Sequence, residues 1–227
     1  FEGIKEKNKD NIVYSLQDAT SYFLNFNLDR KSYKFTSKTS DAEKKSTQEA
    51  VLNKNFRQAI NFAYDRTAYG AQSQGQDGAT KILRNLVVPP TFVTVGAKDF
   101  GAVVSEKMVN YGQEWQGMNF ADAQDPYYNP EKAKAKFAEA KKELQAKGVQ
   151  FPIHLDKTVD LTNKAEIQGI NSMKQSIESV LGSDNVVIDV HQLSTEDFDN
   201  TSYLAQTAAQ KDYDLYNGGW SADYQDP

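Results

Sequence analysis

The pattern of apolar and polar positions is irregular in the first half of the chain and regular in the second half. From residue 129 onward, apolar residues at helical spacing alternate with short apolar runs, which predicts helices alternating with strands. The predicted helices cover residues 129–147, 167–181 and 194–210, and the predicted strands cover 151–156, 186–193 and 212–220. This order predicts an α/β fold, with a mixed sheet flanked by helices and crossover helices between strands.

The first half of the chain gives fewer local signals. Residues 11–17 alternate apolar and polar side chains, and residues 20–27 form a more apolar run, so both are predicted to be strands. Residues 29–50 are charged and almost lack large apolar side chains, which predicts an exposed, mobile loop. A helix is predicted from Asn53, its N-cap residue, and residues 70–129 are expected to form short helices and long loops.

Composition narrows the classes of function. The net charge is -5 and the basic residues are scattered, which argues against a nucleic-acid partner. The chain has no cysteine, which excludes disulfides, thiolate metal sites and cysteine nucleophiles. The sequence carries no Gly-x-Ser-x-Gly, His-Glu-x-x-His, phosphate-binding loop or dinucleotide fingerprint. We therefore expect a binding protein without a cofactor and not an enzyme, and we keep a paired-carboxylate hydrolase as the enzymatic alternative.

The last ten residues carry the clearest candidate site. Gly218 and Gly219 allow close approach of another chain, Trp220 and Tyr224 offer flat apolar faces, and Asp223 places a carboxylate between them. This arrangement at the end of a strand suits a ligand that carries an amine. From the residues alone, the more ordinary interpretation is that Asp223 caps a turn and Trp220 packs in the core.

Several motifs resemble, in order, the signature of the extracytoplasmic oligopeptide-binding proteins of peptide ABC transporters, and together they span nearly the whole chain. They are Tyr22-Phe23-Leu24-Asn25-Phe26-Asn27, Asn55-Phe56-Arg57-Gln58-Ala59-Ile60-Asn61-Phe62-Ala63-Tyr64-Asp65-Arg66, Pro89-Pro90, Tyr128-Asn129-Pro130-Glu131-Lys132-Ala133, and the run from Tyr213-Asp214 to Trp220-Ser221-Ala222-Asp223-Tyr224-Gln225-Asp226-Pro227. The Lys/Gln/Asn-rich composition is similar to that of streptococcal lipoprotein receptors. The chain departs from the family between Asn27 and Asn55, where a Lys/Ser/Thr-rich segment replaces a short proline-containing turn.

The resemblance implies a receptor in which two lobes close on an oligopeptide. Residues 1–227 would then form one α/β lobe, the C-terminal peptide-binding lobe, and the second lobe and a lipid anchor would lie outside them. Asp223 would pair with the α-amino group of the peptide, because a desolvated ammonium needs a counter-charge. Trp220 would flank a side-chain pocket, and Gly218 and Gly219 would let the peptide backbone pair with the strand edge.

The resemblance also implies partners and a location. The receptor would deliver peptides to the permease subunits of a transporter from the outer face of the cytoplasmic membrane. Tyr22 and Asn27 are candidate cleft residues, although alternating aromatic residues on a strand are more often core. Two further classes remain open: a receptor for nickel, haem or sugar, and a surface module that binds a protein partner. His154 and His191 lie on separate predicted strands, so packed histidines are favoured over a metal site.

Overall fold

The computed structural model describes residues 2–13, 19–221 and 223. Within these residues a four-stranded sheet has the order β1-β6-β4-β5. Its strands are β1 (Thr20–Phe26), β4 (Ile153–Asp160), β5 (Val186–Leu193) and β6 (Leu215–Ser221). β4 runs parallel to β5 and β6, whereas β1 runs antiparallel to β6, so the sheet is mixed as the sequence predicts.

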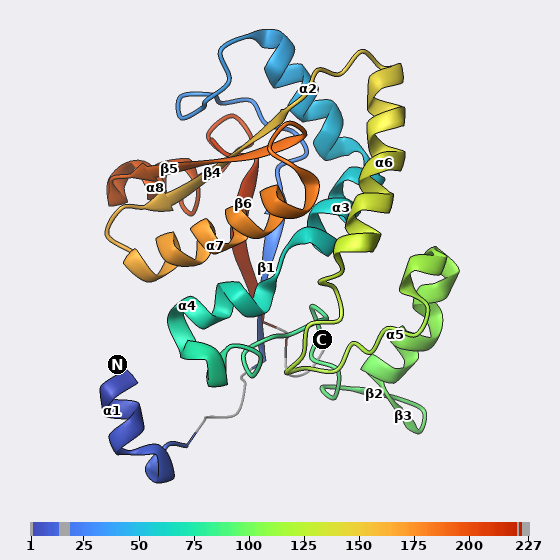
Figure 1. Ribbon diagram of the computed structural model, residues 1–227, viewed down its shortest axis with the longest axis vertical. Coiled ribbons are helices and arrows are strands. Elements are labelled where there is room, and N and C mark those ends of the chain that lie inside the picture. Colours follow the sequence, from blue (N-terminus) through green and yellow to red (C-terminus); the bar gives the residue numbers. More distant parts are fainter. Residues whose placement is uncertain (1, 14–18, 222, 224–227) are drawn as a thin grey trace.

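Helices flank this sheet (Figure 1). The helices are α1 (Glu2–Lys7), α2 (Asp41–Leu52), α3 (Lys54–Ala63), α4 (Arg66–Gly78), α5 (Phe100–Met108), α6 (Pro130–Ala146), α7 (Lys164–Leu181) and α8 (Thr195–Thr201). Short 3-10 turns cover Lys9–Asn11, Val109–Tyr111 and Gln113–Trp115, and a small hairpin joins β2 (Thr94–Val95) to β3 (Lys98–Asp99). Of the interval 70–129, for which short helices and long loops were predicted, residues 70–78 belong to α4, and residues 79–129 are mainly loops and short elements.

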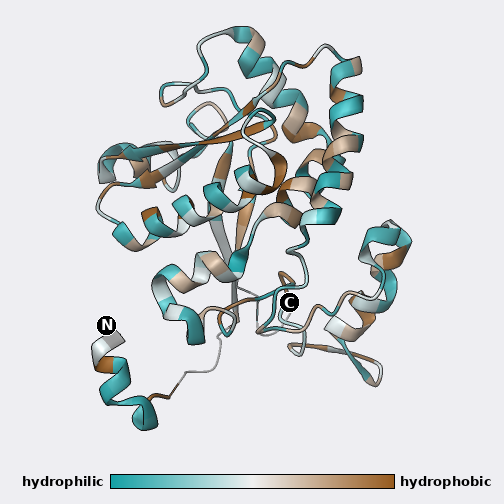
Figure 2. Ribbon diagram, viewed as in Figure 1, coloured by the Kyte–Doolittle hydropathy of each residue, from teal (hydrophilic) through white to brown (hydrophobic). Residues whose placement is uncertain are grey.

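The main core lies between the sheet and helices α3, α6 and α7. In α6, Ala133, Phe137, Ala140 and Leu144 recur at helical spacing, and all are buried. Val186 and Ile188 of β5 belong to the same buried cluster. Figure 2 shows the result: hydrophobic residues gather on the strands and the inward sides of the helices, and hydrophilic residues cover the outer side of α6.

Capping residues explain where the well-predicted helices begin. The side chains of Asn53 and Asn129 accept hydrogen bonds from the backbone N–H groups of Phe56 and Lys132, three residues further on. Pro130 occupies the first turn of α6, where its missing N–H leaves no hydrogen bond unmade. These side chains fix the starts of α3 and α6 locally, which is why sequence alone located them.

The prediction for residues 29–50 was wrong. The segment contains α2, which begins with a capping box formed by Ser40 and Glu43. It also buries Arg30 and Lys38 almost completely, each with 4% exposure. Ion pairs of Arg30 and Lys38 hold the segment together with Ala50, which is buried in the core, so the lack of large apolar residues was a poor guide to exposure.

Other differences concern element ends. The helix after Ser194 ends at Thr201 instead of near residue 210, because Ser202 has non-helical backbone angles. The last strand begins at Leu215, three residues later than predicted, although the backbone of Asp214 still bonds to Asn27 and to Asp156. For the predicted strand 11–17, Asn11 lies in a 3-10 turn, and residues 14–17 fall outside the described residues.

In the part of the chain that the structure describes, no helix has the length and apolarity required to cross a bilayer.

Candidate functional site

The β1–β6 ribbon carries most of the predicted site residues at one end. Tyr22 lies opposite Gly219, and Ser21 lies opposite Trp220. Tyr22 is 78% exposed and Trp220 is 40% exposed, so neither is a core residue. Partners directly opposite each other share a face, and consecutive residues alternate faces, so Tyr22 and Trp220 project from opposite sides of the ribbon. A ligand at this end therefore meets an aromatic surface on either side.

The two glycines of β6 fit closely under side chains of β1. A Cβ atom at Gly218 would lie 2.4 Å from Asn25 Nδ2, and one at Gly219 would lie 3.0 Å from the Tyr22 ring. One edge of β6 is thus already paired with β1. On its other edge β6 pairs with β4 at Leu215, and among the described residues no strand pairs with that edge from residue 216 onward. This outer edge is where an extended ligand backbone can add.

The remaining predicted residues fall in different places. Asp223 is exposed and lies two residues after the end of β6 and three after Trp220 in the sequence, and Tyr224 lies outside the described residues. Asn27 lies beyond the opposite end of β1, where its Nδ2 donates to the Tyr213 carbonyl at 3.1 Å. The structure thus groups Tyr22, Gly218, Gly219 and Trp220 and separates Asn27 from them; Asn27 joins β1 to the segment before β6.

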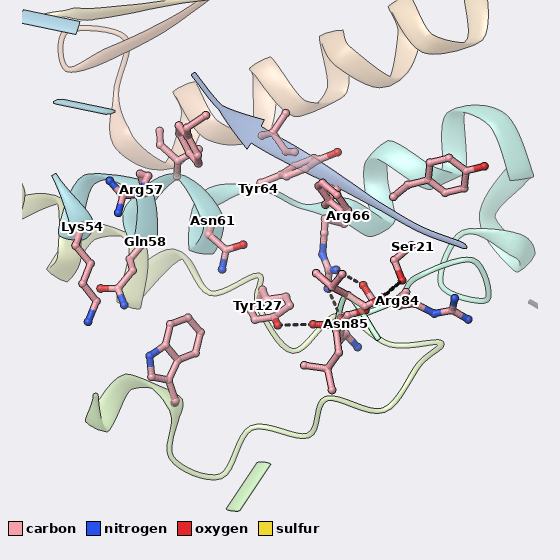
Figure 3. Close-up of a pocket in the computed structure, with 18 residues that line it drawn as sticks. Ser21, Lys54, Arg57, Gln58, Asn61, Tyr64, Arg66, Arg84, Asn85 and Tyr127 are labelled. Carbon is pink, nitrogen blue, oxygen red and sulfur yellow. Dashed lines mark hydrogen bonds between the residues drawn. The ribbon is translucent and has the colours of Figure 1, made fainter. Parts of the chain in front are cut away.

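A cavity of about 460 Å³ adjoins β1 beside this end of the ribbon (Figure 3). One wall is the outer face of α3, from which Lys54, Arg57, Gln58 and Asn61 project at helical spacing. Sequence reasoning missed this wall. The signal was present in the polar positions of the helix that follows Asn53.

The opposite wall is a rigid hydrogen-bond network. Arg66 Nη2 contacts Asp125 Oδ1 at 2.5 Å and donates to Asn85 Oδ1 at 2.7 Å. Tyr127 donates its hydroxyl to the Asn85 carbonyl at 2.7 Å, and burial raises the pKa of Tyr127 to about 12. The hydroxyl therefore stays protonated at neutral pH. Figure 3 shows these side chains facing the α3 wall across the cavity, with Arg84 beyond them.

A second cavity, of about 760 Å³, adjoins the same strand near α4 and α7. Its polar corner is formed by Asn217 of β6, whose Nδ2 donates to Glu166 Oε1 at 3.0 Å and to the Tyr69 hydroxyl at 3.3 Å. Tyr22 borders both cavities. Gly218, Gly219, Trp220 and Asp223 line neither cavity, so Tyr22 is the predicted site residue that connects the ribbon to them. The two cavities together offer a concave surface beside β1 that is large enough for several residues of an extended ligand.

A buried ion cluster lies away from this surface. Arg30 and Lys38 contact Asp156, Asp212 and Asp214 at 2.6–3.0 Å. Burial alone raises the pKa of Asp156, but the hydrogen bond from His191 and the charge of Lys38 outweigh it and hold that pKa well below its usual range. The cluster ties the segment after β1 to β4 and to the segment before β6, and so fixes the base of the ribbon.

The two histidines have carboxylate partners. His154 Nδ1 lies 2.7 Å from Asp189 Oδ2, and His191 Nε2 lies 2.8 Å from Asp156 Oδ1. They occupy separate sites, as predicted, and hydrogen bonds to carboxylates rather than apolar packing alone hold them. Within the described ranges, no group of three His, Cys, Asp or Glu side chains is arranged to hold a metal ion.

The structure thus combines a mixed sheet flanked by helices with two cavities beside β1. Residues 2–227 match the family described as "Bacterial extracellular solute-binding proteins, family 5 Middle". The chain belongs to this family of bacterial extracellular solute-binding proteins. The resemblance found in the sequence motifs is thereby confirmed.

Curated relatives match the whole chain. The chain is 78% identical to the oligopeptide-binding protein AliB of Streptococcus pneumoniae and 57% identical to the oligopeptide-binding protein SarA of Streptococcus gordonii. It covers 35% of AliB and 34% of SarA, so it spans about a third of the length of these relatives.

Solved structures share the fold. OppA of Listeria monocytogenes bound to peptide matches with a TM-score of 0.57 at 18% identity, covering 98% of this chain and 35% of that one. The pheromone receptor PrgZ matches with a TM-score of 0.54 at 20% identity, covering 98% of this chain and 34% of that one. At these identities the likeness establishes the fold, and the predicted α/β class is confirmed.

Proposed function

We propose that this chain is the peptide-binding lobe of an oligopeptide receptor that serves a peptide ABC importer. The structural observation that carries the proposal is the exposed end of the β1–β6 ribbon, where Tyr22 and Trp220 are exposed on opposite faces and β6, with one edge unpaired from residue 216 onward among the described residues, is followed in the sequence by Asp223. The high identity to two oligopeptide-binding proteins supports a peptide as the ligand. The family description supports an extracytoplasmic location.

The proposed mechanism is capture by electrostatic and backbone contacts. The carboxylate of Asp223 pairs with the free ammonium group of the peptide, which loses its hydration when the cleft closes. The peptide backbone adds to the outer edge of β6 and is recognised without regard to sequence. A second lobe, contributed by the rest of the receptor, closes over the peptide, and the closed state is what the permease recognises. A lipid anchor outside this chain tethers the receptor to the membrane.

The fold alone does not select a peptide over other solutes. MelB in complex with stachyose has a similar fold, with a TM-score of 0.50 at 17% identity and coverage of 92% of this chain and 27% of that one. The proposal that the ligand is a peptide therefore rests on the similarity to oligopeptide-binding relatives and on the carboxylate of Asp223, and not on the fold. Capture in this mechanism involves no bond cleavage, and we propose no catalytic role for the chain.

The test is a calorimetric titration of the two-lobed receptor with a short peptide pool, compared with the same pool after N-acetylation. Asp223→Asn is expected to weaken binding of free-amine peptides by at least 30-fold, since removing one partner of a desolvated charge pair costs about 2 kcal/mol or more. Asp184→Asn, an exposed carboxylate on the turn before β5, is the matched control and leaves binding unchanged. Equal affinity for free and acetylated peptides contradicts the proposed role of Asp223.

A further inference from the structure

The cavity beside α3 has a chemical bias that the proposed ammonium site does not explain. Four polar side chains line it from α3, and two of them, Lys54 and Arg57, are cations. The residues that line this cavity include no aspartate and no glutamate. Figure 3 shows Lys54, Arg57, Gln58 and Asn61 side by side along the helix, opposite Tyr127.

The two cations on α3 are not neutralised by ion pairs. In the described structure neither Lys54 nor Arg57 forms a salt bridge; Arg57 Nη1 donates to the Val51 carbonyl at 2.7 Å and Lys54 Nζ to the Tyr111 carbonyl at 3.3 Å. The cations on the far side of the cavity differ, because Arg66 pairs with Asp125 and Arg84 pairs with Asp122. Positive charge without a counter-ion is thus confined to the α3 wall.

The nearest acidic group is already engaged. Glu114 lies behind the α3 wall, where its Oε1 accepts a hydrogen bond from Gln58 Nε2 at 2.8 Å and lies 3.6 Å from Lys136 Nζ. Glu114 thus has its own cation and its own donor. Burial alone raises the pKa of Glu114, but its hydrogen bonds and the charges of Lys136 and Lys54 outweigh burial and lower that pKa. Glu114 therefore offsets part of the positive potential of Lys54, and Arg57 has no such acidic neighbour among the residues that line the cavity.

The same wall holds polar groups that lack partners. Gln58 is only 7% exposed, and within the described residues its buried Oε1 has no hydrogen-bond partner. A buried acceptor without a donor costs free energy, which a ligand N–H would recover. The Asn61 amide also has no hydrogen bond among the described residues and points into the cavity (Figure 3).

The rest of the lining is apolar and suits the stem of a side chain. It includes Leu24, Phe26, Ile60, Val87 and Trp115. A group that enters this cavity therefore meets an apolar wall, two cations, and an acceptor that needs an N–H. A carboxylate on a short apolar stem next to a peptide amide has this combination of features.

We infer that the cavity beside α3 binds a carboxylate of the captured peptide, held by Lys54 and Arg57, while Gln58 accepts from an adjacent amide N–H. The inference depends on the proposed function, because it assigns a subsite within the same receptor. The carboxylate can come from an acidic side chain or from the C-terminus of the peptide. The subsite makes the receptor selective for anionic peptides although the backbone contacts are independent of sequence.

The experiment uses the two-lobed receptor and peptides that differ in one carboxylate. One pair carries Glu or Gln at a single position and a C-terminal amide; the second pair carries Gln there and ends in an acid or an amide. The wild-type receptor is expected to prefer the anionic member of at least one pair by about tenfold at low ionic strength. The first pair reports a side-chain carboxylate, and the second reports the C-terminus.

Variants assign the preference to the α3 wall. Lys54→Met and Arg57→Met each reduce the preference ratio, the double variant reduces it to about one, and Arg57→Lys retains most of it. Arg57 also binds the Val51 carbonyl, so thermal unfolding of each variant is measured beside the titration. Lys54 is exposed, so Lys54→Met tests the subsite without disturbing that contact. Lys134→Met, an exposed cation on α6, is the control and leaves the ratio unchanged.

Two results overturn the inference, and they are distinguishable. If the wild type binds free-amine peptides but shows no preference within either pair, or if the preference survives the double variant, the carboxylate subsite is wrong and the proposed function stands. If no peptide of either pair binds to the wild type, the proposed function fails and the subsite fails with it.

Discussion

The buried ion cluster is the feature whose perturbation should affect stability most. Lys38 Nζ lies 2.6 Å from both Asp156 Oδ2 and Asp214 Oδ2, and these side chains are between 0% and 3% exposed. Replacing Lys38 with methionine keeps the stem and removes the charge. Arg30 then faces three buried carboxylates alone, with contacts to Asp156 and Asp214 at 2.6 Å and 3.0 Å.

Removing one partner of a buried ion pair costs about 3–5 kcal/mol, because the remaining charge stays buried without compensation. A domain of ordinary stability has about 5–15 kcal/mol in total, so Lys38→Met should remove a large part of it. The matched control is Lys34→Met, which breaks an exposed ion pair to Asp197 with 65% and 45% of the two side chains exposed. Such a pair is worth at most about 1 kcal/mol.

The assay is urea unfolding of the 227-residue chain at pH 7, followed by tryptophan fluorescence and far-UV circular dichroism. Lys38→Met should shift the midpoint far below that of the wild type, and Lys34→Met should barely move it. A loss of less than about 1 kcal/mol for Lys38→Met would refute the assignment of the cluster as the anchor of the segment. Unfolding curves that keep the same m-value ensure that stability, not compactness, has changed.

Acid should weaken the same cluster. The pKa of Asp156 is lower in the folded chain than in the unfolded chain, where it is about 3.9. A lowered pKa means that the stabilisation is present above pH 4 or so and is lost as the pH falls below that value. Asp156→Asn should therefore show a shallower fall in stability between pH 5 and pH 2 than the wild type. An equally steep fall in both would contradict the pKa assignment.

Three further substitutions test local arguments by urea unfolding. Burial lowers the pKa of Lys157 to about 8, so the folded chain disfavours the charged form of this side chain. Lys157→Met should therefore stabilise the fold at pH 7 by about 1–3 kcal/mol. This gain should vanish above about pH 10.4, the pKa of lysine in the unfolded chain. A destabilised variant at pH 7 would disprove this. Gly169→Ala should cost about 1–3 kcal/mol, because the new Cβ would lie 2.8 Å from the Tyr69 ring; an unchanged midpoint would mean that the ring moves freely. Ser40→Ala should cost about 1 kcal/mol through loss of the capping box, and Ser37→Ala, outside the cap, is its reference.

The sequence predicted the second half of the fold well because its signals are local. Asn129 and Pro130 cap α6, and Gly148 follows it with a positive φ of 76°. Apolar positions at regular spacing then place α7 and β5. Each of these signals is contained within one element, so a single sequence suffices to interpret them.

In the segment 29–50, the capping box of Ser40 and Glu43 was a local signal for α2 that was missed, whereas the burial of Arg30 and Lys38 could not be predicted because their contacts are non-local. Lys38 meets Asp156 and Asp214, which are separated from it by 118 and 176 residues. A lysine that will be buried in an ion cluster and a lysine that will be solvated look the same in a single sequence. The fold decides between them, and here it places three carboxylates around the two cations.

The sequence singled out some residues of the candidate site and missed others, because part of the site depends on contacts that are distant in the sequence. Trp220 and Tyr22 were singled out from motifs, and the structure brings their strands together at the exposed end of the ribbon. The cation-bearing wall of the cavity beside α3 was missed, because Lys54 and Arg57 occupy positions that are solvated in most amphipathic helices. Only the loops opposite α3 turn that polar face into a cavity wall.

The central claim is that this surface captures the free amine end of a peptide beside Trp220. The most direct measurement is an NMR titration of the two-lobed receptor that follows the indole N–H of Trp220 and the backbone amide of Asp223, with a free-amine peptide and its N-acetylated twin. The account predicts saturable shifts at both positions with the free-amine peptide and much weaker shifts with the acetylated one. Identical shifts with both peptides, or saturable binding that leaves both signals unmoved, would contradict it.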